Sequence, residues 1–213
     1  LEAAIRACEL RPDDDEAWVL RSNLERQLDR TQDAKQSAKW VLDRNPSSPT
    51  AWMAFGSALL AESHPEEALA AQERAIALDS TLATAHSNRG NALLILNRLD
   101  EALEAVDQSL KIDPLLAHGW DKRALILAEF GRYEKALAAC HQARSIDPDS
   151  SPSLRNEADI LRRMQRHDEA LTACEAALAR EPDHAETLLT RGRIFHELGD
   201  LTRAIADYKA ARM

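Results

Sequence analysis

The chain has 213 residues, and 45% of them are hydrophobic, which is enough apolar material for a folded core and excludes wholesale disorder. The formal net charge is −9, from 36 acidic and 27 basic side chains, which argues against a general nucleic-acid binder because such proteins need a basic surface. The sequence has no run of about 18 apolar residues, so no membrane-spanning helix is expected. Its abundance of alanine, leucine, glutamate and arginine favours helix over sheet.

The cysteines and the first residue bear on the compartment and on the extent of the chain. Three cysteines do not make a disulfide framework, so we expect a reducing, cytoplasmic compartment. Because the chain begins at Leu1 and not at a methionine, we expect a segment of a longer protein, and any targeting signal of that protein would lie outside this segment.

A period of 34 residues runs through the sequence in four columns. Proline marks one column in five periods and serine in the other: Pro12, Pro46, Ser80, Pro114, Pro148 and Pro182. A second column is always alanine: Ala34, Ala68, Ala102, Ala136, Ala170 and Ala204. A third is always small: Ser22, Gly56, Gly90, Ala124, Ala158 and Gly192. A fourth is mostly large and apolar: Trp18, Trp52, His86, Trp120, Leu154 and Leu188.

Each period predicts two helices joined by a turn. In the third period, apolar side chains recur at helical spacing over residues 83–96, and a second helix is predicted over 99–112. Pro114 ends it, because proline disfavours the helical conformation in the preceding residue. Residues at the break between the two helices tolerate the left-handed backbone of a turn: Asp29, Asn97, Gly131 and Gly199. In chain order, we predict the second helix of a partial repeat (1–14), five full repeats (15–48, 49–82, 83–116, 117–150 and 151–184) and an incomplete sixth (185–213).

The columns of small residues have a packing explanation. A small residue on the first helix is expected to meet the alanine of the second helix where the two axes approach most closely. Leucine in place of Ala102 would therefore overpack the crossing at a cost of about 1–3 kcal/mol. Because one hairpin cannot bury both of its apolar faces, the hairpins are expected to stack into a solenoid with a continuous core.

This pattern resembles the tetratricopeptide repeat family over nearly the whole chain. The resemblance implies an all-α fold, a right-handed α–α superhelical solenoid of helix–turn–helix repeats. Two departures are His86 in the large column and Ser80 in the proline column. The resemblance also implies that exposed positions of the first helices line a concave groove that binds a partner. The expected groove residues are Asn23, Met53, Ser57, Ser87, Asn88, Asn91, Asp121, Lys122, Arg155, Asn156, Asp159, Arg162 and Arg193.

Asn88 and Asn156 occupy equivalent positions two repeats apart, with Lys122 between them. An asparagine carries a donor and an acceptor, so it can hold a peptide backbone without reading its side chains. The stretch from His86 to Asn91 is similar to the repeats of the O-linked N-acetylglucosamine transferase superhelix, where an asparagine ladder has this role. In this sequence the ladder is interrupted at three positions: Leu20, Ala54 and Thr190. Ordinary solvated asparagines are the alternative interpretation.

Positive charge gathers on the late first helices, at Lys122, Arg155, Arg162, Arg163 and Arg193. Because a guanidinium group binds a carboxylate bidentately, this cluster favours an acidic peptide or a C-terminal carboxylate as the ligand. The alternative is that these residues form ion pairs on a solvated helix face, since acidic residues accompany them in the sequence.

No motif for catalysis, metal binding or cofactor binding is present in the sequence. The histidines never recur at the His-x-x-x-His spacing that places two imidazoles on one helix face for zinc. Cys140 and Cys174 share a repeat position and are interpreted as small buried apolar residues. No glycine-rich phosphate loop and no nucleophile elbow occur. We therefore expect no enzyme activity, no metal and no cofactor.

The sequence predicts a non-catalytic scaffold that binds an extended peptide or partner segment in the groove, with a protein or peptide as the partner and neither nucleic acid nor membrane insertion. Two alternatives are open. One is the substrate-recognition arm of a larger enzyme such as a glycosyltransferase. The other is a self-assembly module that forms a homo-oligomer through uncapped terminal repeats, with Ala204, Ile205, Tyr208 and Ala211 partly bare on the last helix.

Overall fold

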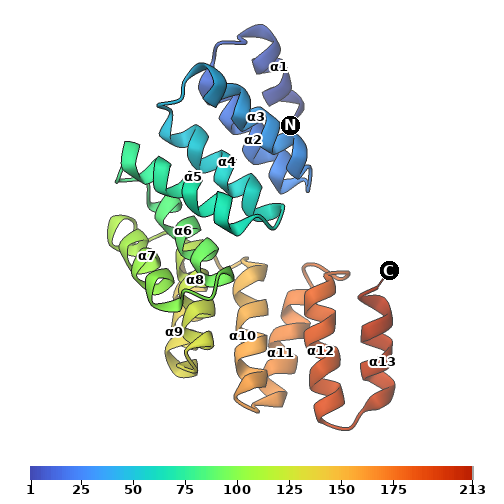
Figure 1. The fold of residues 1–213 in the computed structure, drawn as a ribbon. Helices are drawn as coiled ribbons and strands as arrows, with labels where there is room; N and C mark the ends of the chain where they lie inside the picture. The colour runs from blue at the N-terminus through green and yellow to red at the C-terminus, as the bar shows by residue number, and fades with distance from the viewer. Residues whose placement is uncertain (213) are drawn as a thin grey trace. The chain divides into compact units, whose positions relative to one another are not determined.

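The structure, a computed structural model, describes residues 1–212, and every regular element in this range is an α-helix (Figure 1). The prediction of an all-α solenoid is confirmed. The chain forms two compact units, Leu1–Pro114 and Leu115–Met213. Among residues 1–212, none of the helices combines the length and the apolar character needed to cross a bilayer.

The first unit contains a single helix followed by three helical hairpins. Its helices are α1 (Glu2–Leu10), α2 (Asp15–Gln27), α3 (Thr31–Arg44), α4 (Pro49–Ala61), α5 (Pro65–Leu78), α6 (Ala83–Ile95) and α7 (Leu99–Ile112). Helices α2 and α3, α4 and α5, and α6 and α7 pack as hairpins, and α1 packs on α2. The second helix of each hairpin packs against the first helix of the next, and successive first helices also touch. These contacts bury apolar faces that one hairpin alone would leave in water.

The second unit contains three hairpins with the same packing. Its helices are α8 (Ala117–Glu129), α9 (Tyr133–Ile146), α10 (Ser151–Arg163), α11 (His167–Leu178), α12 (Ala185–Glu197) and α13 (Leu201–Ala210). Figure 1 shows α10 to α13 side by side, and α12 packs on both α10 and α11. The first helices α8, α10 and α12 therefore form a continuous wall within this unit, because α8 contacts α10 and α10 contacts α12.

The turn inside each hairpin has one residue in the left-handed conformation, at the same repeat position each time. These residues are Asp29, Ser63, Asn97, Gly131, Gln165 and Gly199, with φ between 58° and 80°. The left-handed turns expected at Asp29, Asn97, Gly131 and Gly199 are present. Ser63 and Gln165 were not predicted, because serine and glutamine are not typical of this conformation.

Aromatic residues of the large column also donate a hydrogen bond to the loop that precedes their helix. The indole Nε1–H of Trp18 donates to the carbonyl oxygen of Pro12 (3.0 Å), and that of Trp52 donates to the carbonyl oxygen of Pro46 (2.9 Å). In the next repeat, Nε2 of His86 lies 3.1 Å from the carbonyl oxygen of Ser80. Because a carbonyl only accepts, His86 donates from Nε2–H. His86 can therefore replace tryptophan, since it also supplies a ring N–H six residues after the loop carbonyl.

In four hairpins, the small residue of the first helix lies against the second helix of the same hairpin. The alanine column is 0–1% exposed in all six repeats. A Cβ added to Gly90 on α6 would overlap Cγ2 of Val106 on α7 and would lie 3.1 Å from the carbonyl oxygen of Ala102. In another hairpin, the Ser22 hydroxyl donates to the carbonyl oxygen of Ala34 (2.7 Å). Gly90 and Ser22 thus lie against the backbone of the alanine column, while Gly56 and Gly192 lie against Gln72 and Tyr208, one turn further along the second helix.

One expectation for the last helix is wrong. Ala204 is 1% exposed, because the alanine column faces its own hairpin partner and needs no following repeat to cover it. The outer face of α13 differs, since Ile205 is 52% exposed while Leu69 and Leu137, at the equivalent position, are 8% and 5% exposed. In those repeats, the first helix of the next hairpin packs on the second helix.

Candidate functional site

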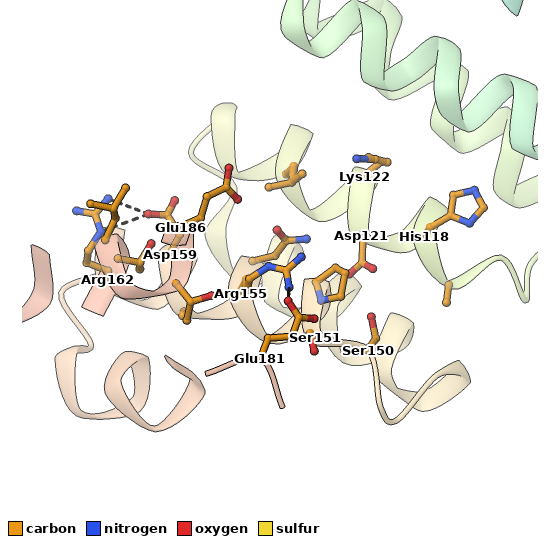
Figure 2. A pocket seen from close by; sticks show the side chains of 18 of the residues that line it. His118, Asp121, Lys122, Ser150, Ser151, Arg155, Asp159, Arg162, Glu181 and Glu186 are labelled. Atoms are coloured by element: carbon orange, nitrogen blue, oxygen red, sulfur yellow. Dashed lines mark hydrogen bonds and ion pairs between the residues drawn. The ribbon is translucent and has the colours of Figure 1, made fainter. Parts of the chain in front are cut away.

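A cavity of about 1070 Å³ lies along the first helices of the second unit, α8, α10 and α12. Figure 2 shows side chains from these helices and from the loop before α10 around it. Helical spacing places residues three and four positions apart on one face, which is why each helix contributes several lining residues. Among the residues expected in the groove, seven line this cavity: Asp121, Lys122, Arg155, Asn156, Asp159, Arg162 and Arg193.

Ion pairs hold most of the cavity arginines in place. Arg162 donates to Asp159 and to Glu197 of α12, both at 2.9 Å (Figure 2 shows the first of these pairs). Arg163 pairs with Asp159 at 2.7 Å and with Glu129 of α8 at 2.8 Å. Two of these ion pairs, Arg162–Glu197 and Arg163–Glu129, join neighbouring first helices, so the arginines stabilise the wall of the cavity.

Arg155 is held in the same way, since it donates to Glu181 (3.1 Å) from α10 to the loop before α12 (Figure 2). The positive cluster expected from the sequence is therefore largely neutralised by carboxylates of the chain itself. These pairs correspond to the alternative interpretation of the cluster as ion pairs on a helix face.

Asp121 forms part of the floor of the cavity and is only 6% exposed. Its Oδ1 accepts a hydrogen bond from the Ser153 hydroxyl at 2.6 Å, and the Asn156 side chain also donates to it. Burial raises the pKa of the Asp121 carboxyl above its ordinary value, because the ionised form loses its hydration. The hydrogen bond from Ser153 and the positive charges of Lys122 and Arg155 lower the pKa, but only in part.

Asp121→Asn is expected to make the protein's stability less dependent on pH. A raised pKa means that the folded state holds the Asp121 proton more tightly than the unfolded state does. This contribution is fully present below the ordinary pKa of 3.8 and is lost as the pH rises through the folded value. The asparagine side chain of this variant would still accept from Ser153 but does not ionise. In urea denaturation, the free energy of unfolding of Asp121→Asn should therefore rise relative to that of the natural protein as the pH increases from about 4 to about 7.

Asp79→Asn is the control with the opposite sign. Hydrogen bonds from the Thr81 side chain and backbone lower the pKa of Asp79, so its contribution to stability is present at neutral pH and is lost as the pH falls. Asp79→Asn should therefore lose stability relative to the natural protein as the pH rises from about 2 to about 4, and should change little from there to about 7. Identical pH profiles for the natural protein and Asp121→Asn would contradict the assignment of a raised pKa to Asp121.

The two asparagines expected to form a ladder have their amide groups oriented by the preceding repeat. Asn88 donates from Nδ2 to the Ser57 hydroxyl (2.9 Å), and that hydroxyl donates to the carbonyl oxygen of Met53 (2.8 Å). Asn156 donates to Asp121, because a carboxylate has no proton to give. In both residues the amide nitrogen is engaged, and this bond fixes the orientation of the side-chain oxygen.

The first unit holds the other residues expected in the groove. Asn23, Met53, Ser57, Asn88 and Asn91 are half-buried on α2, α4 and α6. Ser87 does not line a groove as expected. Its side chain is 0% exposed, and its hydroxyl oxygen is buried without a hydrogen-bond partner among the described residues. The reason is side-chain length: Arg155, at the equivalent position of a later repeat, is long enough to reach the cavity, whereas a serine ends beneath its neighbours.

Several lining residues were not predicted from the sequence. Ser150 and Ser151 lie at the start of α10, and Glu181 lies in the loop before α12. Loop residues do not follow the helical spacing from which the groove was predicted. Glu186 and Thr190 on α12 are different, because they precede Arg193 by seven and three residues and share its face. Helical spacing from Arg193 could have identified them.

The three cysteines are free and buried, as expected for Cys140 and Cys174. Burial raises the pKa of Cys174 to about 12 and raises that of Cys140 well above its ordinary range, so both stay as neutral thiols. Among residues 1–212, no group of three or more His, Cys, Asp or Glu side chains is arranged to hold a metal ion.

Sequence models of a known repeat family match most of the chain. Models described as tetratricopeptide repeat match residues 19–83 and 155–212, which is more than half of the chain, and a further model with this description matches 83–114. No curated protein matches the chain.

Solved structures with similar folds share little sequence with this chain. A chain of the APC/C hetero-tetramer Cut9–Hcn1 superposes with a TM-score of 0.86 at 13% identity, over 98% of this chain and 41% of that one. The TPR protein TTC0263 of Thermus thermophilus gives 0.74 at 20% identity, over 93% of this chain and 100% of that one. YrrB, described as a TPR protein with an unusual peptide-binding site, gives 0.54 at 20% identity, over 82% and 90%. At these identities the similarity shows the fold alone.

Proposed function

Because the chain belongs to the tetratricopeptide repeat family, whose fold is typical of protein–protein interaction, we propose that it is a non-catalytic scaffold that binds an extended segment of a partner protein. The proposed site is the cavity along α8, α10 and α12. The observation that carries this proposal is the position of the cavity: it lies on the first helices, and polar side chains from all three of them face it.

The ion pairs around the cavity support this proposal. Long arginine side chains normally lose conformational freedom when a ligand binds, and this loss weakens binding. Here Arg155, Arg162 and Arg163 are already held by carboxylates. A partner segment would meet a wall that is ordered in advance, with the Asn156 side-chain oxygen available to accept from its backbone N–H groups.

Two of the similar structures agree with this type of function. YrrB is described by its peptide-binding site, and the Cut9 and Hcn1 chains form part of an assembly.

Asn156→Ala is expected to weaken the binding of peptides selected with the natural protein. Decapeptides would be selected from a random display library, and their Kd values would be measured by fluorescence anisotropy. Loss of one hydrogen bond should raise the Kd about fivefold. Gln142→Ala on the second helix α9 is the matched control, because Gln142 is exposed and lies outside the cavity lining. Both variants should keep the helical circular dichroism signal. Equal Kd values for both variants and the natural protein would place the binding site elsewhere, and a failure to select any peptide would count against the scaffold itself.

A further inference from the structure

Two charged residues that line the cavity have no ion-pair or hydrogen-bond partner among the described side chains. They are Glu186 and Arg193, both exposed and both on α12. Each of the other arginines that line the cavity is held by at least one carboxylate. Glu186 and Arg193 are therefore the charges that can pair with a ligand without first breaking a contact within the chain.

Arg193 lacks an ion-pair partner among the described residues because the nearest carboxylate on its own helix is engaged elsewhere. Glu197 lies one helical turn further along α12 and would be the natural partner of Arg193 within the helix. Its carboxylate instead accepts from Arg162 of α10 at 2.9 Å and lies 3.6 Å from Nδ1 of His167 on α11. The ion pairs that join α10 to α12 thus occupy the carboxylate that would otherwise neutralise Arg193.

The two free charges lie on one face of α12 at a defined separation. Glu186 precedes Arg193 by seven residues, which is two helical turns, and Leu189 and Thr190 between them also line the cavity. With a rise of 1.5 Å per residue, the two positions are about 10 Å apart along the helix axis. A peptide in the extended polyproline II conformation advances about 3.1 Å per residue and has three residues per turn. Side chains three residues apart therefore lie on one face of the peptide, about 9 Å apart.

We propose that α12 selects partner segments that carry one basic and one acidic side chain three residues apart. The basic side chain pairs with Glu186 and the acidic side chain pairs with Arg193. This inference rests on the proposed function, because it names the chemical class of segment bound in the same cavity. Charge complementarity of this kind gives specificity and orientation more than affinity.

The test uses three fluorescein-labelled decapeptides in one serine–alanine background. They differ only at positions 4 and 7, which carry lysine and aspartate, two lysines or two aspartates. The natural protein is expected to prefer the mixed peptide by about three- to tenfold over the other two. Glu186→Arg should prefer the peptide with two aspartates, and Arg193→Glu should prefer the peptide with two lysines. Raising the salt concentration should shrink each preference, because screening weakens exposed ion pairs.

Arg74→Glu is the matched control for Arg193→Glu. Arg74 is an exposed arginine on α5 that has no ion-pair partner among the described residues, so its reversal changes the net charge equally without touching the cavity. This variant should keep the preference of the natural protein. If all four proteins bind the peptides with the same preference, the assignment to Glu186 and Arg193 is overturned while the scaffold proposal stands. If no protein binds any of the three peptides, both the assignment to Glu186 and Arg193 and the scaffold proposal fail.

Discussion

Replacing Gly90 by leucine is expected to lower the free energy of unfolding by about 2–3 kcal/mol, although leucine is the better helix former by roughly 1 kcal/mol. The clash begins at the first side-chain atom, since even a Cβ at Gly90 would overlap Cγ2 of Val106. Val106 is fully buried and branched at Cβ, so it cannot turn aside. The carbonyl oxygen of Ala102, 3.1 Å from the added atom, belongs to the backbone of α7 and moves only with the helix. Urea denaturation followed by circular dichroism would measure the loss.

Gly131→Asn is the control for this prediction. Gly131 has a φ of 71° and nothing within 4 Å of an added Cβ, so only its backbone conformation restricts it. Asparagine already occupies the equivalent position at Asn97, with a φ of 58°. We expect Gly131→Asn to leave the stability nearly unchanged. A Gly90→Leu variant as stable as this control would show that α6 and α7 separate without cost.

Glu25→Ala is expected to lower the free energy of unfolding by about 2–4 kcal/mol, from the cavity it creates and the polar groups it leaves unpaired. The Glu25 side chain is 0% exposed. Its carboxylate accepts from Nε of Arg21 and from the Ser37 hydroxyl, both at 2.7 Å. Arg21 is partly exposed and also lies over the ring of Trp18, so its guanidinium group can be hydrated again. The buried Ser37 hydroxyl cannot.

The double variant Glu25→Leu/Ser37→Ala is expected to have the opposite effect and raise the free energy of unfolding by about 1–2 kcal/mol. The other repeats show why the replacement fits. In the next four repeats the position of Glu25 holds Leu59, Leu93, Leu127 and Leu161, each 0–4% exposed. In the same four repeats the position of Ser37 holds Ala71, Ala105, Ala139 and Ala173, each 1–7% exposed. A buried ion pair contributes little net stability because both charges lose hydration, whereas a well-packed leucine has no such cost. A double variant less stable than the natural protein would show that the Glu25 contacts contribute more than their desolvation costs.

The residues that line the cavity (Figure 2) show which parts of the site could be predicted from the sequence and which could not. Helical spacing on the first helices identified seven residues that line the cavity, because spacing along one helix fixes which residues share a face. It failed for Ser87, which is fully buried, and it missed the burial of Asp121. Both have short side chains, and the depth of a short side chain depends on neighbouring helices that are distant in sequence.

The repeat, and with it the fold, follows from the order of the amino acids alone. A column of alanine, a column of small residues and a column with a ring N–H or a large apolar group recur every 34 residues, so the local choices all agree with one hairpin. The left-handed turns at Ser63 and Gln165 are consistent with that repeat even though their residue types do not favour them, since the hairpin requires the same turn in each period. Burial of the apolar faces then required stacking.

Which charges are free, in contrast, is set by contacts between helices. Arg155, Arg162, Arg163 and Arg193 look alike in the sequence, but the first three find carboxylates on other segments of the chain. Whether a guanidinium group meets such a partner depends on how neighbouring hairpins are placed, and sequence spacing within one helix carries no information on this. The ion pair of Glu197 with Arg162 of α10 leaves Arg193 without a partner among the described residues. This contact between helices, distant in sequence, sets the charge that the cavity presents.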